Sequence, residues 1–260
     1  MTHQTLIVVA NKFVSFAVDK QVVTLSQLDT MLSLSKHVLP GQFQIIPGQG
    51  VSDEDIAELI EKIETHDPER DRWNVSALHQ HPKRADASLS HKHKCRNTLI
   101  AAPQMVDHDN YLIDLLIDEN SELMDDHQTG QHIQGMILVE AGRQAFLAVT
   151  ERFFLTDAKQ KSYFVINSME TNFLGFVFPT PAHIQYRVIS KDINDRRQRF
   201  SVEVSVVQGG EIRMKTAFAF TAYPDEVIAN KEASLAVDAV DFALRDPLHP
   251  KKSAAHVEAA

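Results

Sequence analysis

The chain has 260 residues, of which 43% are hydrophobic, and its 26 basic and 35 acidic side chains give a formal net charge of −9. That length and apolar content are sufficient for one large domain or two smaller ones with a packed core. An acidic chain of ordinary composition lacks the basic surface that general nucleic-acid binding requires, so no nucleic-acid partner is expected.

Membrane insertion and export are also not expected. No stretch approaches the roughly 20 consecutive apolar residues of a membrane span. The first apolar run, Leu6 to Ala10, is shorter than the roughly 7–15 residues of a signal-peptide core. Cys95 is the single cysteine, so no intrachain disulfide forms and nothing indicates an oxidising compartment. These features predict a cytoplasmic protein without a membrane span.

The first 75 residues alternate short apolar runs with helical patterns. Capping-box spacing predicts that helices begin after Thr24 and after Ser52. The glycine pair at 48 and 50 is interpreted as a turn, because the acids at 53–55 would repel a bound phosphate. Strands are predicted at 6–10, 13–18 and 42–46. Residues 1–75 are therefore expected to form a small α/β domain.

Residues 76–95 lack a repeating apolar period and are interrupted by proline, which predicts a linker that is partly mobile. Two groups within it, His79-x-His81 and His91-x-His93-x-Cys95, contain metal-ligating side chains. Their spacing fits no familiar structural zinc site, so no metal site is predicted.

From residue 96 to residue 224 the pattern is that of several strands and one long helix. Gly209-Gly210 is a strong signal for a two-residue hairpin turn between the last two strands. A final helix is predicted at 226–244, so residues 225–260 are expected to form a C-terminal helix and a frayed tail. The predicted strands are 98–101, 111–117, 163–168, 173–177, 182–190, 200–208 and 211–222.

The segment from Gly135 to Val149 is apolar around nearly its whole circumference, which predicts a helix buried on all sides. A strand, a loop, this helix and then a run of antiparallel strands is the order of a hotdog fold, in which a curved sheet wraps one central helix. We therefore predict an α+β protein with a hotdog domain at 96–224 behind the small α/β domain.

Glu140, Arg143 and Gln144 interrupt this apolar helix and share one of its faces, at spacings of three and four residues. Burying a charge is costly unless the charge is paired or has a task. One interpretation is an internal salt bridge that seats the helix against a partner subunit. The other is a carboxylate and a guanidinium placed at a polar spot beside an apolar tunnel.

The string from Asp126 to Ala145 resembles the A-factor biosynthesis (AfsA-type) hotdog family. That family carries Asp-His, a short loop, His, a Gly-Met step and then Glu-Ala-x-Arg-Gln. The corresponding residues here are Asp126-His127, His132, Gly135-Met136 and Glu140 to Gln144. A weaker resemblance extends over about residues 90–222. The segment is also similar, more distantly, to acyl-thioester dehydratases of the hotdog superfamily.

The resemblance implies an acyltransferase that uses an acyl thioester. Family members transfer a β-ketoacyl group from an acyl carrier protein to glycerone phosphate or a similar three-carbon hydroxyl compound, toward butyrolactone or butenolide signalling molecules. The expected partners are therefore an acyl carrier protein or coenzyme A thioester and a small phosphorylated or hydroxyl acceptor, without a metal or redox cofactor. Well-known members carry two tandem hotdog units, so a homodimer of this single unit is expected to rebuild the double body.

Two alternatives stay open. The first is a thioesterase or 3-hydroxyacyl-thioester dehydratase built on the same fold. The second is a non-catalytic acyl-binding module, in which Glu140 and Arg143 only pair with each other.

Four residues are predicted to be catalytic. Glu140 is the candidate base or substrate-orienting carboxylate, with a pKa that apolar surroundings would raise. Arg143 is expected to bind a phosphate or carboxylate of the acceptor, or to hold Glu140 ionised. Either His127 or His132 is expected to take the proton of the attacking hydroxyl, and His132 lies closer to the helix start. Each histidine has an alternative role in fixing the shape of the loop.

A substrate-binding set is predicted beside them, made of Gly135, Met136 and Gln144. Backbone N–H groups near Gly135 and Met136 would stabilise the carbonyl oxygen, and glycine would let the thioester approach the backbone closely. A compact basic cluster is predicted to be either a solvated hairpin turn or a weak docking site for an acidic carrier protein. The cluster consists of Arg196, Arg197 and Arg199.

Overall fold

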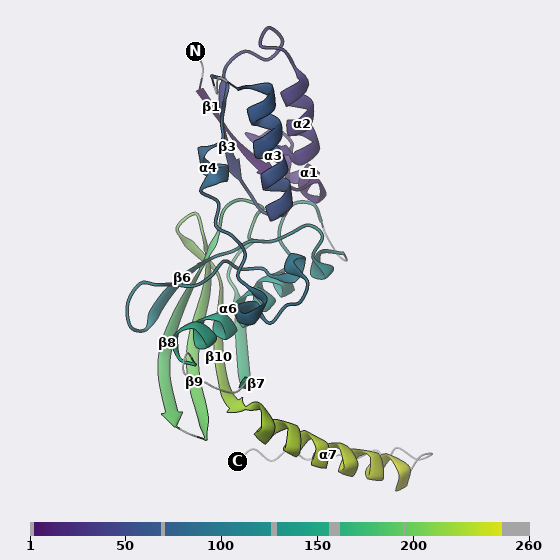
Figure 1. The fold of residues 1–260 in the computed structure, drawn as a ribbon, viewed down its shortest axis with the longest axis vertical. Coiled ribbons are helices and arrows are strands. Elements are labelled where there is room, and N and C mark those ends of the chain that lie inside the picture. Colours follow the sequence, from purple (N-terminus) through teal and green to yellow (C-terminus); the bar gives the residue numbers. More distant parts are fainter. Residues whose placement is uncertain (1–2, 69–70, 126–128, 156–161, 195, 246–260) are drawn as a thin grey trace.

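The computed structural model describes residues 3–68, 71–125, 129–155, 162–194 and 196–245. A parallel sheet with its helices forms one end of the molecule, and an antiparallel sheet around a central helix forms the other (Figure 1). A further helix, at the C-terminal end, projects from the second unit.

The N-terminal unit is a four-stranded parallel sheet in the order β2–β1–β3–β4. Helices α2 (Leu25–Ser33) and α3 (Asp53–His66) pack on one face, and both begin with the predicted capping boxes, at Thr24 and Ser52. The strands are β1 (His3–Val9), β2 (Val22–Thr24), β3 (Gln42–Pro47) and β4 (Trp73–Asn74). The predicted small α/β unit is therefore present.

The strand predicted at 13–18 is wrong. This segment is helical instead, with the turn η1 (Asn11–Phe13) followed by α1 (Val14–Ala17). Phe13 and Phe16 are both buried. A spacing of three residues places two side chains on one face of a helical turn but on opposite faces of a strand, so burial of both selects the helix.

The second unit is a six-stranded antiparallel sheet in the order β5–β6–β8–β9–β10–β7, with α6 (Gly135–Phe153) across its concave face. Twelve of the nineteen residues of α6 are buried. Phe146 of α6 stacks on Phe220 of the sheet at 4.3 Å. The strands are β5 (Gln104–Met105), β6 (Asn110–Asp114), β7 (Ser162–Phe173), β8 (His183–Asn194), β9 (Arg197–Gln208) and β10 (Glu211–Pro224). The predicted hotdog fold is confirmed.

Strand boundaries differ from the prediction in three places. The strand predicted at 163–168 is longer, since β7 continues to Phe173 and pairs with β10 over that length. The strand predicted at 173–177 is wrong, because residues 174–177 lie outside the strands. Residues 98–101 form only isolated bridges, Arg84 with Ala101 and Ile100 with Leu115.

One hydrophobic cluster spans the two units, and a second lies within the N-terminal unit. Val9 and Phe13 of the first unit belong to the same buried cluster as Ile137 of α6. The buried Gln49 side chain fixes the contact, because its Nε2 donates to Leu115 O and its Oε1 accepts from Ile117 N, both at 2.8 Å. The two units are therefore in direct contact through buried side chains.

Residues 76–95, predicted to be a partly mobile linker, are packed between the two units. They contain α4 (Ser76–His79) and α5 (Ala87–Ser90), and α5 lies against α6. The buried Arg84 forms an ion pair with Asp53 at the start of α3. The predicted mobility does not fit this packing, which depends on contacts between distant residues that local composition does not encode.

The helix predicted at 226–244 is present as α7 (Asp225–Arg245). The predicted tail, 246–260, lies outside the described residues. Within the described ranges, none of the helices combines the length and the apolar character needed to span a bilayer.

We expect Gln49→Ala to lower the free energy of unfolding of the whole chain by roughly 2–4 kcal/mol, because two buried backbone groups lose their partners. Urea unfolding followed by both fluorescence and circular dichroism would measure this, with Gln44→Ala on the exposed sheet surface as the matched control. A separate early transition of the N-terminal unit in the unaltered protein would contradict the shared core.

Candidate functional site

Helix α6 begins at the surface, and no side chain caps its first turn. The loop before it is held by the N-terminal unit, since Phe16 N donates to Gly130 O at 3.0 Å and Gln131 Nε2 donates to Ser15 O at 2.8 Å. On the other side, Ile133 N donates to the Val177 carbonyl at 2.8 Å. The start of the helix is thereby fixed relative to both units.

A hollow of about 370 Å³ opens beside this helix start. His132 is the ionisable side chain among its lining residues, and its ring lies 4.6 Å from that of Phe176. The Nδ1 atom of His132 is 3.2 Å from Thr129 Oγ1. The lining residues are His132, Ile133, Gly135, Leu138, Phe173, Gly175, Phe176 and Val177. The structure thus brings His132 and Gly135, both predicted site residues, to one apolar cavity.

A residue larger than glycine at position 135 would have to displace the ring of Phe173. A β-carbon on Gly135 would lie 2.7 Å from Phe173 Cε1, which is too close for any contact with a real side chain. The space beside Gly135 was predicted to hold the thioester, but an aromatic ring occupies it. Because 54% of the Phe173 surface is exposed, the ring forms a wall of the hollow rather than a part of the core.

Glu140 and Arg143 form the predicted ion pair on another side of α6. Arg143 binds the carboxylate through two nitrogens, with Nε 2.7 Å from Oε2 and Nη2 2.8 Å from Oε1. Leu138 lines the hollow, and a step of two residues rotates the side chain by about 200° around a helix. The Glu140 carboxylate therefore faces away from the hollow of its own chain.

Lys92 is a third member of this network that the sequence analysis missed. Its Nζ lies 2.8 Å from Glu140 Oε1, and it comes from the segment predicted to be a linker. The spacing that identified Arg143 is local to the helix, whereas residues 92 and 140 meet only through the tertiary fold. No local sequence signal identifies Lys92.

The pKa of Glu140 shows which force dominates at this position. Burial alone would raise it, but the hydrogen bonds and charges of Arg143 and Lys92 outweigh burial and lower it to about 2. The expected rise in pKa is therefore wrong. A carboxylate with so low a pKa is a weak proton acceptor at neutral pH, which fits the internal ion pair better than the general base.

Gln144 holds the segment that contains Asn97 and Leu99 against α6. It is completely buried, its Oε1 accepts from Leu99 N at 2.8 Å, and its Nε2 donates to Asn97 O at 2.9 Å. The same Nε2 is 3.0 Å from Glu140 Oε1. Its amide is thus occupied by the protein itself, which does not fit the predicted contact with substrate.

The other predicted residues lie apart from the hollow or outside the description. The Met136 side chain is 59% exposed and is not among the residues that line the hollow. His127 lies outside the described residues.

The predicted docking cluster lies far from the hollow of the same chain. Phe173 lines the hollow. Strand pairing through β10 and β9 aligns it with Ile184 of β8. Strand β8 continues from there for ten residues to Asn194, roughly 33 Å at 3.3 Å per residue. The cluster follows at the β8–β9 turn and comprises Arg196, Arg197 and Arg199. This position matches the solvated hairpin turn of the two interpretations.

Histidines of the two histidine-rich segments contact glutamate side chains on helices of the protein. His91 Nε2 is 3.1 Å from Glu151 Oε1, and His79 Nε2 is 3.3 Å from Glu64 Oε1. In the part of the chain that the structure describes, no group of three or more His, Cys, Asp or Glu side chains is placed to hold a metal ion.

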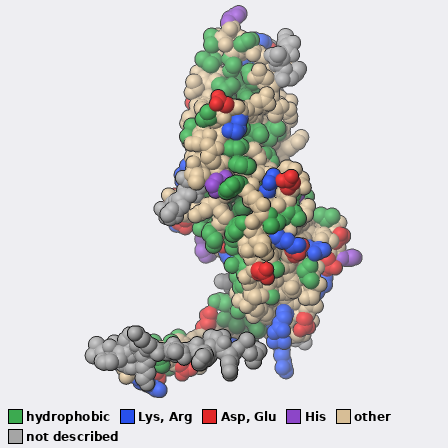
Figure 2. All heavy atoms as spheres, turned by 180° about the vertical axis from the view of Figure 1, so that it is seen from behind, with side chains coloured by type: hydrophobic (Ala, Val, Ile, Leu, Met, Phe, Trp, Pro, Cys, Tyr) green, Lys and Arg blue, Asp and Glu red, His purple; other side chains and the backbone are tan. Residues whose placement is uncertain are grey.

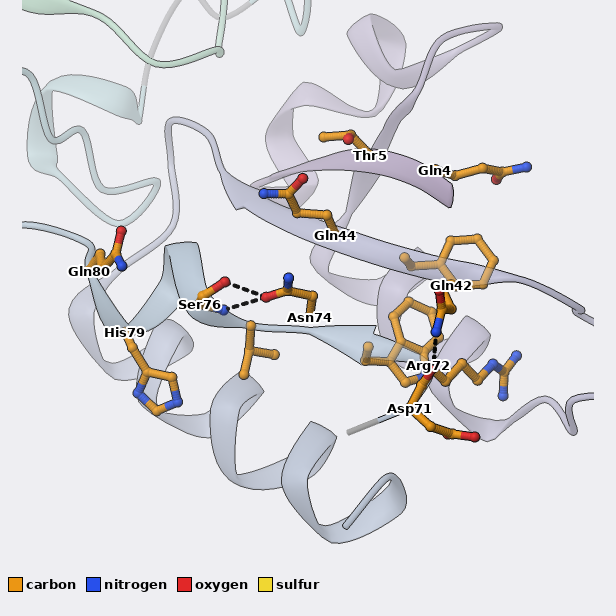
Figure 3. Close-up of a pocket in the computed structure, with 13 residues that line it drawn as sticks. Gln4, Thr5, Gln42, Gln44, Asp71, Arg72, Asn74, Ser76, His79 and Gln80 are labelled. Carbon is orange, nitrogen blue, oxygen red and sulfur yellow. Dashed lines mark hydrogen bonds between the residues drawn. The ribbon is translucent and has the colours of Figure 1, made fainter. Parts of the chain in front are cut away.

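A second hollow, of about 440 Å³, lies on the N-terminal unit (Figure 3). Thr5, Gln44 and Asn74 lie in one cross-strand row there, on three adjacent strands. The charged lining residues serve the unit itself, since Asp71 pairs with Lys36 at 2.6 Å and Arg72 donates to backbone carbonyls at 34 and 39. Sequence reasoning did not find this hollow, and its groups are not arranged for acid–base chemistry.

Comparison with known proteins places the second unit in a family. Residues 73–224, more than half of the chain, match the family described as an A-factor biosynthesis hotdog domain. No curated protein matches the chain in sequence.

Solved structures show weaker likeness. A thioesterase variant from Pseudomonas aeruginosa is 14% identical with a TM-score of 0.37, covering 52% of this chain and 89% of that one. A conserved protein from the same organism is 17% identical with a TM-score of 0.34, over 46% and 86% of the two chains. A protein from Pyrococcus horikoshii is 18% identical with a TM-score of 0.35, over 54% and 93%. Similarity at these values of identity and TM-score supports no conclusion about the reaction of this chain.

The low pKa of Glu140 predicts a pH-dependent contribution to stability. A depressed folded-state pKa stabilises the protein above the ordinary value of 4.5, and this contribution is lost as pH falls through about 2. We expect Glu140→Gln to lower the free energy of unfolding by about 3 kcal/mol at pH 7, with a smaller difference from the unaltered protein at pH 3.

Urea unfolding at pH 7, 4 and 3 would measure that difference, with Glu61→Gln at an exposed position of α3 as the control. The ion-pair account predicts that the two proteins differ less in free energy of unfolding at pH 3 than at pH 7. A difference that stays constant from pH 7 to pH 3 would contradict it.

Proposed function

This chain belongs to the A-factor biosynthesis hotdog family, and from that membership we propose that it binds an acyl thioester at the start of α6 and transfers the acyl group to a small hydroxyl acceptor. The supporting observation is the hollow of about 370 Å³, where an uncapped helix start, a histidine and apolar walls meet. The thioester comes from an acyl carrier protein or coenzyme A. The acceptor is glycerone phosphate or a related three-carbon compound, on the route to a butyrolactone or butenolide.

The helix start supplies the electrostatic part of the proposed reaction. The first N–H groups of a helix have no partner within the helix, and the helix dipole places partial positive charge there. A thioester carbonyl beside Gly135 and Met136 would accept hydrogen bonds from these groups, which stabilise the negative charge that develops on its oxygen. Leu138 and Val177 give the acyl chain an apolar wall.

His132 is the proposed base. The acceptor oxygen bonds to the carbonyl carbon, its proton passes to the imidazole, and the carbon–sulfur bond breaks. The imidazole then returns the proton to the departing thiolate. His127, in the same loop but outside the described residues, is the second candidate for this role.

Arg143 and Lys92 are proposed to hold Glu140 ionised. Both contact its carboxylate, and they lie with it on the side of α6 that faces away from the hollow. In this proposal the three side chains seat the helix, and Glu140 does not move a proton.

A homodimer through β7 is part of the proposal. β7 is an edge strand of the sheet, so one side of its backbone has no strand partner among the described residues. Ile166, Met169 and Phe173 pair with residues of β10 that are buried under α6, yet they are themselves 42%, 49% and 54% exposed. Pairing two β7 strands about a two-fold axis would continue the sheet and cover these side chains.

One observation favours a second candidate function. The fully paired Glu140, with a pKa of about 2, is also what a non-catalytic acyl-binding module would show, because there the pair only holds the helix. The two functions differ in turnover, which the following experiment measures.

The purified protein is incubated with a β-ketoacyl thioester, as coenzyme A and as carrier-protein conjugate, together with glycerone phosphate. Mass spectrometry then identifies the products. Ester formation supports transfer, free acid alone supports a thioesterase, and tight binding without product supports the binding module. A 3-hydroxyacyl thioester in place of the ketoacyl substrate tests for dehydration.

We expect His132→Gln to lower the rate of ester formation by about 10²-fold or more, the usual contribution of a general base. Gly135→Val is expected to lower it too, since a side chain there would displace the Phe173 ring, which is a wall of the hollow. His108→Gln, an exposed histidine elsewhere, is the matched control. Full ester formation by both site variants would exclude the hollow as the reaction site.

A further inference from the structure

Helix α7 lies almost entirely outside the body of the molecule. It follows the end of β10, at the edge of the sheet formed by β7, and points away from that edge (Figure 1). In the view from behind, the visible side chains of the projecting part lie clear of the body (Figure 2). Ile228 is the one buried side chain among its described residues. Leu235, Phe242 and Leu244 are 55%, 79% and 71% exposed.

Three apolar side chains of α7 form one stripe along the helix, since Ile228, Leu235 and Phe242 recur every seven residues. At about 100° per residue, Asp241 lies roughly 120° from Leu235, whereas Asp238 borders the stripe and Leu244 lies on the other side. The helix has 21 residues and is about 31 Å long, and its stripe is left in water beyond Ile228.

The charge of α7 argues against a membrane or an acidic carrier protein as the cover. The helix carries five acidic side chains and two basic ones. Helices that bind membrane surfaces carry basic residues on the polar face, because cytoplasmic leaflets are negatively charged. An apolar protein surface is therefore the better match.

This chain has such a surface around the candidate hollow. Phe173, Leu174 and Phe176 are 54%, 62% and 63% exposed, and the nearby Met136 is 59% exposed. Phe173 and Phe176 line the hollow itself. We call Met136, Phe173, Leu174 and Phe176 the mouth residues.

The α7 helix cannot reach the mouth residues of its own chain. It begins beside Ser162, which pairs with Pro224, whereas Phe173 is at the opposite end of β7. Eleven residues of strand separate these ends, about 36 Å at 3.3 Å per residue. The helix also points away from the sheet rather than back along it (Figure 1).

A two-fold axis through the middle of β7 would instead bring the start of α7 close to the mouth residues of the other chain. Antiparallel pairing of β7 with its copy then sets Ser162 of one chain beside Phe173 of the other. The start of α7 comes next to the second copy's mouth residues, and the helix points past the β7 edge, toward that copy. Two uncovered apolar surfaces of one sequence are brought together by the same axis.

We propose that α7 of each chain packs its apolar face over the mouth residues of a second copy and closes the outer wall of that copy's hollow. This inference rests on the homodimer in the proposed function. Each site is then incomplete in a monomer, because its cover comes from the other chain.

Crosslinking between two differently tagged chains tests this contact. One chain carries Cys95→Ser with Leu174→Cys, the other Cys95→Ser with Leu235→Cys, and a short bismaleimide is added to the mixed dimer. We expect a linked product that contains both tags. The matched control, Ser234→Cys, lies on the polar side of α7 and should give several-fold less.

The oligomeric state, measured by analytical ultracentrifugation of the same samples, separates the possible failures. A dimer without the mixed product overturns the contact of α7 and leaves the β7 dimer and the proposed reaction intact. A monomer overturns the dimer and this inference with it, while the ester assay still judges the reaction. A monomer whose α7 drives binding to phosphatidylglycerol vesicles assigns the apolar face to a membrane.

A second variant tests the consequence for the site. Phe242→Asp places a charge on the apolar stripe of an exposed helix, so the fold should persist, and Asp241→Asn, away from the stripe, is the matched control. We expect Phe242→Asp to weaken binding of a fluorescent acyl-coenzyme A about tenfold or more, and the control to leave it unchanged. Equal affinity in a dimeric Phe242→Asp protein would overturn the cover.

Discussion

A helix that is apolar around its circumference has to be enclosed, and the enclosure of α6 organises the whole chain. The antiparallel sheet covers one side, where Phe146 contacts Phe218 and Phe220. The segment around α5 covers the other, held by the buried amide of Gln144. The first turn stays open, and the hollow lies there. The position of the candidate site is thus a consequence of how the helix is buried.

The N-terminal unit is best understood as a support for that opening. Open α/β sheets usually bind ligands beyond the carboxyl ends of their strands, at the point where the strand order reverses. Here that position, after β1 and β3, is filled by the second unit. A β-carbon on Gly48 would lie 2.5 Å from Pro179 O, and Gly50 N donates to Ile117 O at 3.0 Å. The glycines serve a close contact between units, and the same unit holds the loop before α6 through Phe16.

Sequence reasoning succeeded where the determining interactions are local. The capping boxes at Thr24 and Ser52, the burial of α6 and the pair of Glu140 with Arg143 each follow from spacings of three or four residues. It failed where distant segments meet. Lys92 approaches Glu140 only through the packing of the supposed linker, and together with Arg143 it lowers the pKa that burial alone would raise. Burial was foreseen, but the number of cations at the carboxylate was not.

The central claim is that an acyl thioester lies at the start of α6, with its carbonyl directed at the helix N-terminus. A crystal structure with a non-hydrolysable β-ketoacyl pantetheine analogue tests it most directly. The account predicts carbonyl oxygen within hydrogen-bonding distance of the Gly135 or Met136 amide, and the acyl chain against Leu138. Electron density for the analogue beside Thr5 and Gln44, or on the Glu140 side of the helix, would contradict it.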